Sequence, residues 1–214
     1  MSYHYPDQLQ TERLDTTFLR LEDVPAWSTF FSNPEAIRFL FIESLGLSTN
    51  EAVAQHMIQK QLDRYKAHRY GLQKLVHRAT GEFIGCCGLL LQELDGQKEI
   101  EVGYHIFPSF WNQGYATEAA KCFIDFAFIA NQTDRVISII DVENYASIRV
   151  AEKNGMSLLR NTTWINDEPV GVYGVSHPQS LQKKSRSYNE ASSCNFFQAS
   201  QDIVRLRIST APLL

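Results

Sequence analysis

The spacing of hydrophobic residues predicts a helical N-terminal third that follows one short strand. The strand is expected over residues 17–21 (TFLRL). After it, Asp23 is a residue type that caps helices and Pro25 suits a first turn. A short helix should therefore carry Trp27, Phe30 and Phe31 into the core.

Two further helices are predicted before residue 68. Asn33 and Pro34 restart a second short helix through Leu40 by the same capping logic. Ser48 and Glu51 have the spacing of a capping box, and the segment after them runs as a helix to about residue 67. Its apolar residues at near-helical intervals are Val53, Met57, Leu62 and Tyr65.

The middle of the chain changes to the alternating period of strands. Residues 70–77, 82–91 and 98–107 form three predicted strands, separated by short turns at Thr80-Gly81 and Asp95-Gly96. Short turns favour antiparallel neighbours, so these strands should form a meander.

The last part of the predicted domain alternates helices and strands. A helix begins near Gly114, with Phe123, Phe126, Ala127 and Ala130 on one side, and a strand covers residues 135–142. A second helix over residues 145–154 stops at Gly155, and residues 158–164 and 169–175 form a closing hairpin. This order predicts an α+β (α/β layered) fold with a mixed central sheet of about six to seven strands and crossover helices after strands 4 and 5.

Length and composition add a domain boundary. At 214 residues and 44% hydrophobic composition, the chain can bury one substantial core. Residues 1–177 are the predicted domain, and residues 178–214 are rich in Ser, Gln and Asn, which favours a mobile or weakly docked extension. The alternative is that residues 203–208 add a strand to an exposed sheet edge.

Charge and cysteine content narrow the class of protein. A formal net charge of −4 argues against nucleic acid as a partner, since such binding needs clustered Lys and Arg. The N-terminus lacks a basic start followed by an apolar run, and no window reaches the length of a membrane span, so we expect a cytoplasmic protein without a membrane partner. The four cysteines show no metal-binding spacing, and we expect no metal; they are predicted core fillers or, for Cys194, a thiol of the extension.

Candidate chemistry concentrates in residues 99–120 (EIEVGYHIFPSFWNQGYATEAA), where a predicted strand feeds a helix through a loop. Such a junction leaves main-chain N–H groups unpaired at the helix N-terminus, where they can hold a diphosphate. Gly114 and Ala116 are small enough for close approach, and Thr117 adds a hydroxyl. The dinucleotide and P-loop fingerprints are both absent, so a nucleotide-binding loop of a different kind is predicted.

Four short motifs resemble those of the GNAT acetyltransferases and follow one another in the family's order. The loop WNQGYA, residues 111–116, is similar to the coenzyme A diphosphate loop Q/R-x-x-G-x-G/A, with Trp111 at the first position. That departure is typical of the ribosomal-protein N-acetyltransferase (RimJ/RimL-like) branch, which the chain also resembles in TERL (11–14), EVGY (101–104) and ATEA (116–119). The resemblance extends over residues 11–175 and implies the GNAT fold and acetyl-CoA as co-substrate.

The resemblance also implies a set of binding residues. A second block, NYAS (144–147), matches family positions where the Asn bonds the pantetheine arm and the Ser lies near the coenzyme sulfur, although both residues could simply cap a helix. A bulge near Gly103 would free main-chain N–H groups for the acetyl carbonyl and pantetheine. The predicted coenzyme-binding residues are Tyr104, His105, Ile106, Asn112, Gln113, Gly114, Tyr115, Ala116, Thr117 and Asn144.

Two predicted catalytic residues complete the site. An amine must be neutral to attack a thioester, and Glu99 and Glu101 project from one face of a strand on which family members carry an acidic base. Glu101 is the first candidate for the catalytic base, and Glu99 is the second. The alternative is that both glutamates simply lie on a solvent-exposed face of the strand. Ser147 would assist loss of the thiolate, whereas Trp111 either shields the loop or fills the core.

The predicted function is acetyl-CoA-dependent N-acetylation of a primary amine, on a protein N-terminus or a small molecule. The alternative is a non-catalytic coenzyme-binding or scaffold module with the same fold. Family resemblance places the acceptor pocket at residues 27–41 and 164–173, and the chain is expected to be a monomer or homodimer.

Overall fold

The computed structural model describes residues 8–130 and 133–177. The chain divides into two units, Met1–Val175 and Ser176–Leu214, and the fold described here is that of the first. The predicted extension at residues 178–214, including residues 203–208 and Cys194, lies outside the described residues.

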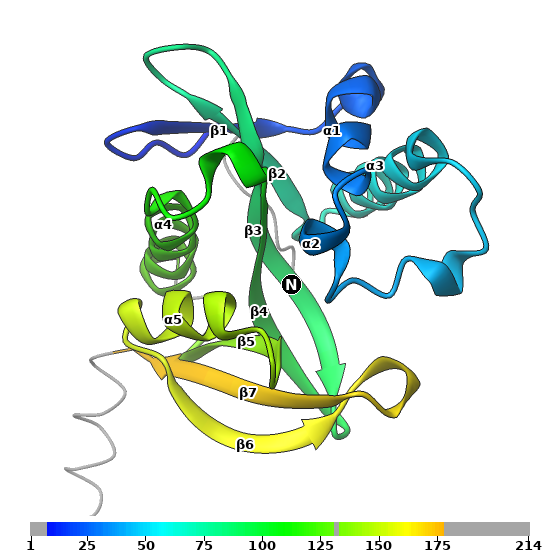
Figure 1. Ribbon diagram of the computed structural model, residues 1–214. Coiled ribbons are helices and arrows are strands. Elements are labelled where there is room, and N and C mark those ends of the chain that lie inside the picture. Colours follow the sequence, from blue (N-terminus) through cyan, green and yellow to red (C-terminus); the bar gives the residue numbers. More distant parts are fainter. Residues whose placement is uncertain (1–7, 131–132, 178–214) are drawn as a thin grey trace, which may run out of the picture. The chain divides into compact units, whose positions relative to one another are not determined.

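A mixed seven-stranded sheet forms the centre of the described part of the chain, in the order β1-β2-β3-β4-β5-β7-β6 (Figure 1). The strands β1 to β4 are antiparallel neighbours, β4 and β5 run parallel, and β6 and β7 form an antiparallel pair. This arrangement confirms the predicted mixed sheet. The strand bounds are Leu14–Phe18 (β1), Leu72–His77 (β2), Phe83–Leu94 (β3), Gln97–Ile106 (β4), Arg135–Asp141 (β5), Ser157–Thr163 (β6) and Pro169–Ser176 (β7).

Helices cover both faces of this sheet. The α-helices are Val24–Phe31 (α1), Pro34–Ile37 (α2), Asn50–Lys66 (α3), Tyr115–Ile129 (α4) and Tyr145–Lys153 (α5). Figure 1 shows α1 to α3 on one side of the strands and α4 and α5 on the other. Because α4 joins β4 to β5 and α5 joins β5 to β6, the predicted crossover helices after strands 4 and 5 are confirmed.

Two apolar clusters fix these layers. On the α4 face, Phe123 and Ala127 pack with Ile100 and Val102 of β4. On the α1 face, a second cluster contains the residues predicted to be buried there, Trp27, Phe30 and Phe31. The alternation of β4 therefore sends its even-numbered side chains toward α4 and its odd-numbered side chains toward α1.

Several predicted element boundaries are wrong. The first strand begins at Leu14, three residues before the prediction, and α2 ends at Ile37 rather than Leu40. Thr49, and not Ser48, caps α3, because its side chain accepts the N–H of Ala52. The predicted helix stop is confirmed, since Gly155 follows α5 with φ of +76°.

Asp23 also differs from its predicted role as the cap of α1. Its side chain makes no capping hydrogen bond to that helix. The carboxylate instead accepts the main-chain N–H of Arg20 at 2.9 Å and pairs with the Lys74 ammonium of β2 at 2.5 Å. Asp23 thus fastens the approach to α1 onto the sheet.

Gly85 permits the close pairing of β3 with β4. Its φ is +149°, and a Cβ at this position would lie 2.1 Å from the His105 carbonyl oxygen and 2.8 Å from the Ile106 Cα. The β2–β3 register also shifts here, since Leu75 pairs with Gly85 and Val76 with Phe83. Only a residue without a side chain allows the end of β4 to approach β3 in this way.

The Gly85→Ala variant should therefore lose about 3 kcal/mol of unfolding free energy, because the backbone of β4 must move away. Urea denaturation measures this loss. The control is Gly81→Ala, in the β2–β3 turn, where φ is +73° but a Cβ would meet no atom within 4 Å. That variant should lose only about 1 kcal/mol, and equal losses would show that the contact with β4 is unimportant.

Candidate active site

Glu101 lies buried at the point where β4 meets β5. The residue is 9% exposed, and its Oε2 accepts a 2.6 Å hydrogen bond from Nε2 of Gln92 on β3. Its Oε1 lies 3.4 Å from the main-chain N–H of Ile139 on β5. Burial raises the pKa of Glu101, and these hydrogen bonds oppose part of that rise. A carboxylate with a raised pKa is a stronger proton acceptor at neutral pH.

Glu99 lies on the same face of β4 but in a different environment. It is 6% exposed and forms an ion pair with Arg135 on β5. The interpretation of both glutamates as a solvated face is therefore wrong. The guanidinium of Arg135 holds the Glu99 carboxylate, whereas Glu101 accepts hydrogen bonds from the neutral Gln92 amide and the Ile139 main-chain N–H, and the positive charge of Arg64 lowers its pKa in part.

The ladder between β4 and β5 is short. Its parallel register pairs Glu101 with Ile137. Phe107, directly after β4, donates its main-chain N–H to Ile84 of β3, and hydrogen-bonding direction alternates along a strand. The N–H groups of Tyr104 and Ile106 consequently point toward the β5 side, beyond the Glu101–Ile137 pair.

The predicted geometry at Gly103 and His105 needs correction. Gly103 pairs with Gly88 in an unbroken β3–β4 register, so the expected bulge is absent from this pair of described strands. The same alternation directs the His105 N–H to β3, where Cys86 is its partner residue. Three main-chain amides were predicted to bind the coenzyme. Those of Tyr104 and Ile106 point away from β3 and could face a ligand, whereas that of His105 points toward β3.

Tyr104 connects β4 with the first turn of α5. Its hydroxyl donates a 3.1 Å hydrogen bond to the main-chain carbonyl of Ser147. Burial raises the pKa of Tyr104, so the hydroxyl keeps its proton at neutral pH. This contact joins the first turn of α5 to the face of β4 that packs against α4.

Asn144 caps α5, as its residue type predicted. The Asn144 Oδ1 accepts the main-chain N–H of Ser147 at 3.1 Å. Capping fixes the side-chain oxygen of Asn144 and the position of Ser147 in the first helical turn. The predicted contacts of both residues with the coenzyme stay a prediction.

The loop before α4 is exposed, and the first amides of the helix that follows it have no acceptor within the helix. Asn112, Gln113 and Gly114 are exposed, and Gly114, with φ of +84°, is an N-cap without a side-chain hydrogen bond. The first intrahelical bond runs from the Glu118 N–H to the Gly114 carbonyl, so the N–H groups of the preceding residues have no acceptor within the helix. Those residues are Tyr115, Ala116 and Thr117. The arrangement fits an anion such as a diphosphate.

Trp111 does not take the predicted role of a core residue, and its other predicted role, shielding the diphosphate loop, stays a prediction. The side chain is 39% exposed, so it does not fill the core. Its indole Nε1–H donates to the Ile106 carbonyl at 2.7 Å, which closes the end of β4. Trp111 therefore fixes the start of the loop relative to the strand.

Several polar contacts of the site were not predicted. Gln92 and Arg135, which hold the two glutamates, carry no local sequence signal for those contacts. Arg13 and Thr11 bind the Glu118 carboxylate of α4 from more than a hundred positions away. These residues lie in the TERL and ATEA motifs, which indicated the family but did not predict that the two motifs contact each other.

His105 is a neutral imidazole within the α1 face. Its ring stacks on Phe30 at a centroid distance of 5.7 Å and lies 6.2 Å from the ring of Trp27. The buried Nδ1 has no hydrogen-bond partner, and burial lowers the pKa of His105 to about 4. His105 is thus unsuited to act as a base in solvent.

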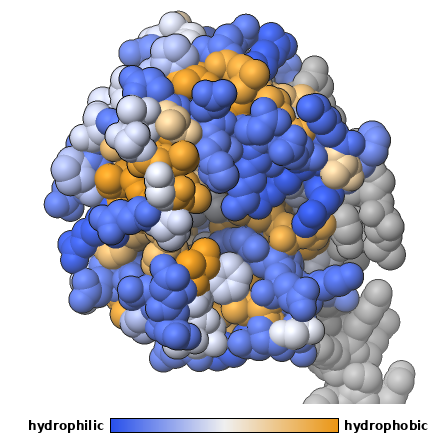
Figure 2. All heavy atoms as spheres, turned by 90° about the vertical axis from the view of Figure 1, so that its right-hand side faces the viewer, coloured by the Kyte–Doolittle hydropathy of each residue, from blue (hydrophilic) through white to orange (hydrophobic). Residues whose placement is uncertain are grey.

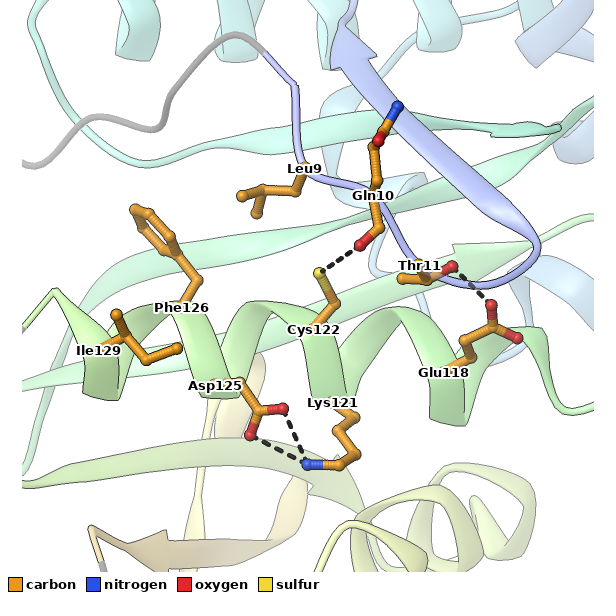
Figure 3. A pocket seen from close by; sticks show the side chains of 9 residues that line it. All are labelled: Leu9, Gln10, Thr11, Glu118, Lys121, Cys122, Asp125, Phe126 and Ile129. Carbon is orange, nitrogen blue, oxygen red and sulfur yellow. Dashed lines mark hydrogen bonds and ion pairs between the residues drawn. The ribbon is translucent and has the colours of Figure 1, made fainter.

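The described residues also contain a hollow of about 440 Å³ that is separate from these groups. It lies between the N-terminal segment and α4 (Figure 3). Figure 3 shows Thr11 bonded to Glu118 at one end, and Leu9, Phe126 and Ile129 at the other. None of the predicted catalytic or coenzyme-binding residues lines it.

The described residues contain no cluster of three or more His, Cys, Asp or Glu that could hold a metal ion. They also contain no helix that is long and apolar enough to span a membrane.

Acid should destabilise the protein through His105. The ring has a pKa of about 4 in the folded state and about 6.5 when unfolded, so the unfolded chain takes up a proton first as the pH falls. The stability that this difference supplies is present above pH 6.5 and declines by about 3 kcal/mol toward pH 4. Urea denaturation across this range should show a steeper decline for wild type than for His105→Phe, and parallel curves would contradict the assignment.

Comparison with known proteins identifies the family. The model of the acetyltransferase (GNAT) domain matches residues 13–157. The protein YkkB of Bacillus subtilis (strain 168) is 41% identical over 96 residues, which are 45% of this chain and 55% of YkkB. The uncharacterized N-acetyltransferase p20 of Bacillus licheniformis is 29% identical over 176 residues, 79% of this chain and 95% of p20.

A solved structure agrees in fold. RimL, a ribosomal L7/L12 alpha-N-protein acetyltransferase in complex with coenzyme A, superposes with a TM-score of 0.63 at 16% identity, covering 78% of this chain and 95% of RimL. The family match extends from the residue before β1 to the first residue of β6, and so includes the α4 loop, β4 and Asn144. The chain belongs to the GNAT acetyltransferase family.

Proposed function

We propose that this protein transfers the acetyl group of acetyl-CoA to a primary amine, on a protein N-terminus or a small molecule. The observation that carries the proposal is the exposed loop before α4 together with the first turn of that helix, whose main-chain amides lack intrahelical acceptors. Residues 1–177 would form the catalytic domain, and RimL supports the choice of coenzyme because it is solved with coenzyme A.

The residues present fit this coenzyme. Amides from Asn112 to Thr117 would hold the diphosphate, and the N–H groups of Tyr104 and Ile106 would face the pantetheine arm and the acetyl carbonyl. Asn144 would add a side-chain contact to the arm. The bound coenzyme supplies an activated acyl group as a thioester.

Glu101 would accept the proton of the attacking amine, directly or through water. Its burial outweighs the hydrogen bonds and the charge of Arg64 that favour ionisation, which leaves its carboxylate more basic than an exposed one. The Tyr104 and Ile106 amides would stabilise the oxyanion that forms on the acetyl carbonyl. The Ser147 hydroxyl would donate to the departing thiolate.

The acceptor would enter from the face that carries α1 to α3 and the β6–β7 turn. Figure 2 shows hydrophobic patches between hydrophilic residues on this face. Trp27, Phe30 and Phe31 belong to the core and not to a cleft, whereas Phe39 and Trp164 are half-buried. An ion pair of 3.0 Å between Arg38 and Glu143 joins the end of α2 to the β5–α5 loop.

The alternative function is a coenzyme-binding or scaffold module without turnover. A panel of primary amines, including peptides with different first residues, separates the two functions when thiol release from acetyl-CoA is followed. Release that depends on the amine supports transfer. Binding of acetyl-CoA by calorimetry without release for any amine supports the module.

The Glu101→Gln variant should lower kcat about 100-fold or more at pH 7, because the amide cannot accept a proton. In wild type, activity should fall as the pH drops through the raised pKa of Glu101, and this acidic limb should vanish in the variant. Steady-state kinetics between pH 5 and 9 measures both effects. A variant with wild-type rates and pH profile would exclude Glu101 as the base.

The Gly114→Ala variant should bind acetyl-CoA at least 10-fold more weakly, because a side chain at φ of +84° strains the loop that presents the amides. The matched control is Gly96→Ala, with φ of +73° in the β3–β4 turn at the opposite end of β4. Both variants should lose about 1 kcal/mol of stability. Calorimetry should detect weakened binding only in Gly114→Ala, and equal affinities would remove the loop from the binding site.

A further inference from the structure

Residues of the TERL and ATEA motifs meet at the start of α4 through side-chain contacts that the proposed function does not use. The Thr11 hydroxyl donates to Glu118 Oε1 at 2.5 Å, and the main-chain N–H of Arg13 donates to the same oxygen at 2.9 Å. The Arg13 guanidinium binds Glu118 Oε2 through Nε and Nη2, both at 2.6 Å. The TERL and ATEA motifs are thus one cluster, made of Thr11, Arg13 and Glu118.

This cluster is held by charge. Burial opposes ionisation of Glu118, but the hydrogen bonds from Thr11 and Arg13 outweigh it, so the pKa of Glu118 is lowered. The carboxylate is therefore ionised at neutral pH, and its Oε2 accepts from two nitrogens of the guanidinium in a charge-assisted ion pair. Arg13 consequently has a fixed position beside the first turn of α4.

From this position Arg13 also binds the loop. Its Nη1 donates to the Gln113 carbonyl at 3.0 Å, and its guanidinium carbon lies 4.2 Å from the centre of the Tyr115 ring. In a trans peptide the carbonyl and the following N–H point in opposite directions. Holding the Gln113 carbonyl toward Arg13 therefore turns the Gly114 N–H away from Arg13.

We propose that Arg13 is a positioning residue for the coenzyme loop, which it serves by setting the direction of the Gly114 amide. Trp111 stands where the family pattern has Gln or Arg, and here a guanidinium reaches the loop from the segment before β1 instead. This inference rests on the proposed function, since it assigns Arg13 to the binding of the coenzyme diphosphate.

The first test measures orientation without any ligand. Residual dipolar couplings of the Gly114 N–H in the free protein report the direction of that bond. The Arg13→Gln variant should change the Gly114 coupling while the couplings of the sheet still fit the wild-type structure. An unchanged Gly114 coupling would overturn the proposal, whether or not the protein is an acetyltransferase.

The second test measures affinity. Arg13→Gln should weaken coenzyme A binding by roughly 10- to 100-fold in calorimetry, as expected for a misdirected hydrogen bond to a charged group. S-acetylpantetheine, which has no diphosphate, should be used by wild type and variant with equal kcat/KM. An equal loss with both donors would contradict a role at the diphosphate.

Matched variants separate positioning from stability. Thr11→Val removes one hydrogen bond to Glu118 but leaves the Arg13 contact with Gln113, so it should lower the melting temperature and keep coenzyme A affinity within about twofold. Arg13→Lys keeps the charge but cannot reach Glu118 and Gln113 together, so it should behave like Arg13→Gln. If Thr11→Val weakens binding as much as Arg13→Gln, the cluster is only structural. If wild type binds no coenzyme A, the proposed function fails, and the dipolar couplings still decide the role of Arg13.

Discussion

Main-chain N–H groups in the first turn of α4 have no acceptor within the helix, and the rest of the candidate site is arranged around that fact. No side chain caps the helix, because its N-cap residue is Gly114 with φ of +84°. Such a set of donors, backed by the helix dipole, favours an anion at this place. A protein that buried these groups or capped them with its own carboxylate would lose the site.

Two side chains hold the loop before α4 in position. Trp111 binds the end of β4 and so fixes where the loop begins, while Arg13 holds the peptide between Gln113 and Gly114. Glu118, the one acidic residue in the first turn, is turned toward Thr11 and Arg13. Its negative charge is thereby neutralised by a guanidinium, which keeps the helix start attractive to another anion.

Local sequence patterns predicted the helices, the strands and the loop before α4. Most of the contacts that were predicted wrongly or not at all join residues far apart in the sequence. Gly114 and the strand-to-helix switch are signals within a few residues, as is Gly155 at the end of α5. The different fates of Glu99 and Glu101 depend on Arg135 and Gln92, which other strands bring to β4. Capping errors at Asp23 and Ser48 arose because a nearby competitor, a lysine of β2 or the next threonine, took the interaction.

Strand geometry could be predicted only in part, because it also depends on contacts between segments far apart in the sequence. Gly103 suggested a bulge, but the β3–β4 register is regular there, and the irregularity lies instead between β2 and β3 at Gly85. A glycine marks where the backbone is permitted to deviate, and the neighbouring strand decides whether it does. His105 illustrates the point, since only the tertiary packing of Phe30 and Trp27 reveals that its ring lies among aromatic side chains.

Binding of the coenzyme diphosphate by the amides at the start of α4 is what we propose for this protein. A titration of the ¹⁵N-labelled protein with coenzyme A, compared with pantetheine, tests it most directly. Coenzyme A should shift the amide signals of Gly114, Tyr115, Ala116 and Thr117 most strongly, and pantetheine should leave them nearly unchanged. Binding of coenzyme A without shifts at these four amides would contradict it.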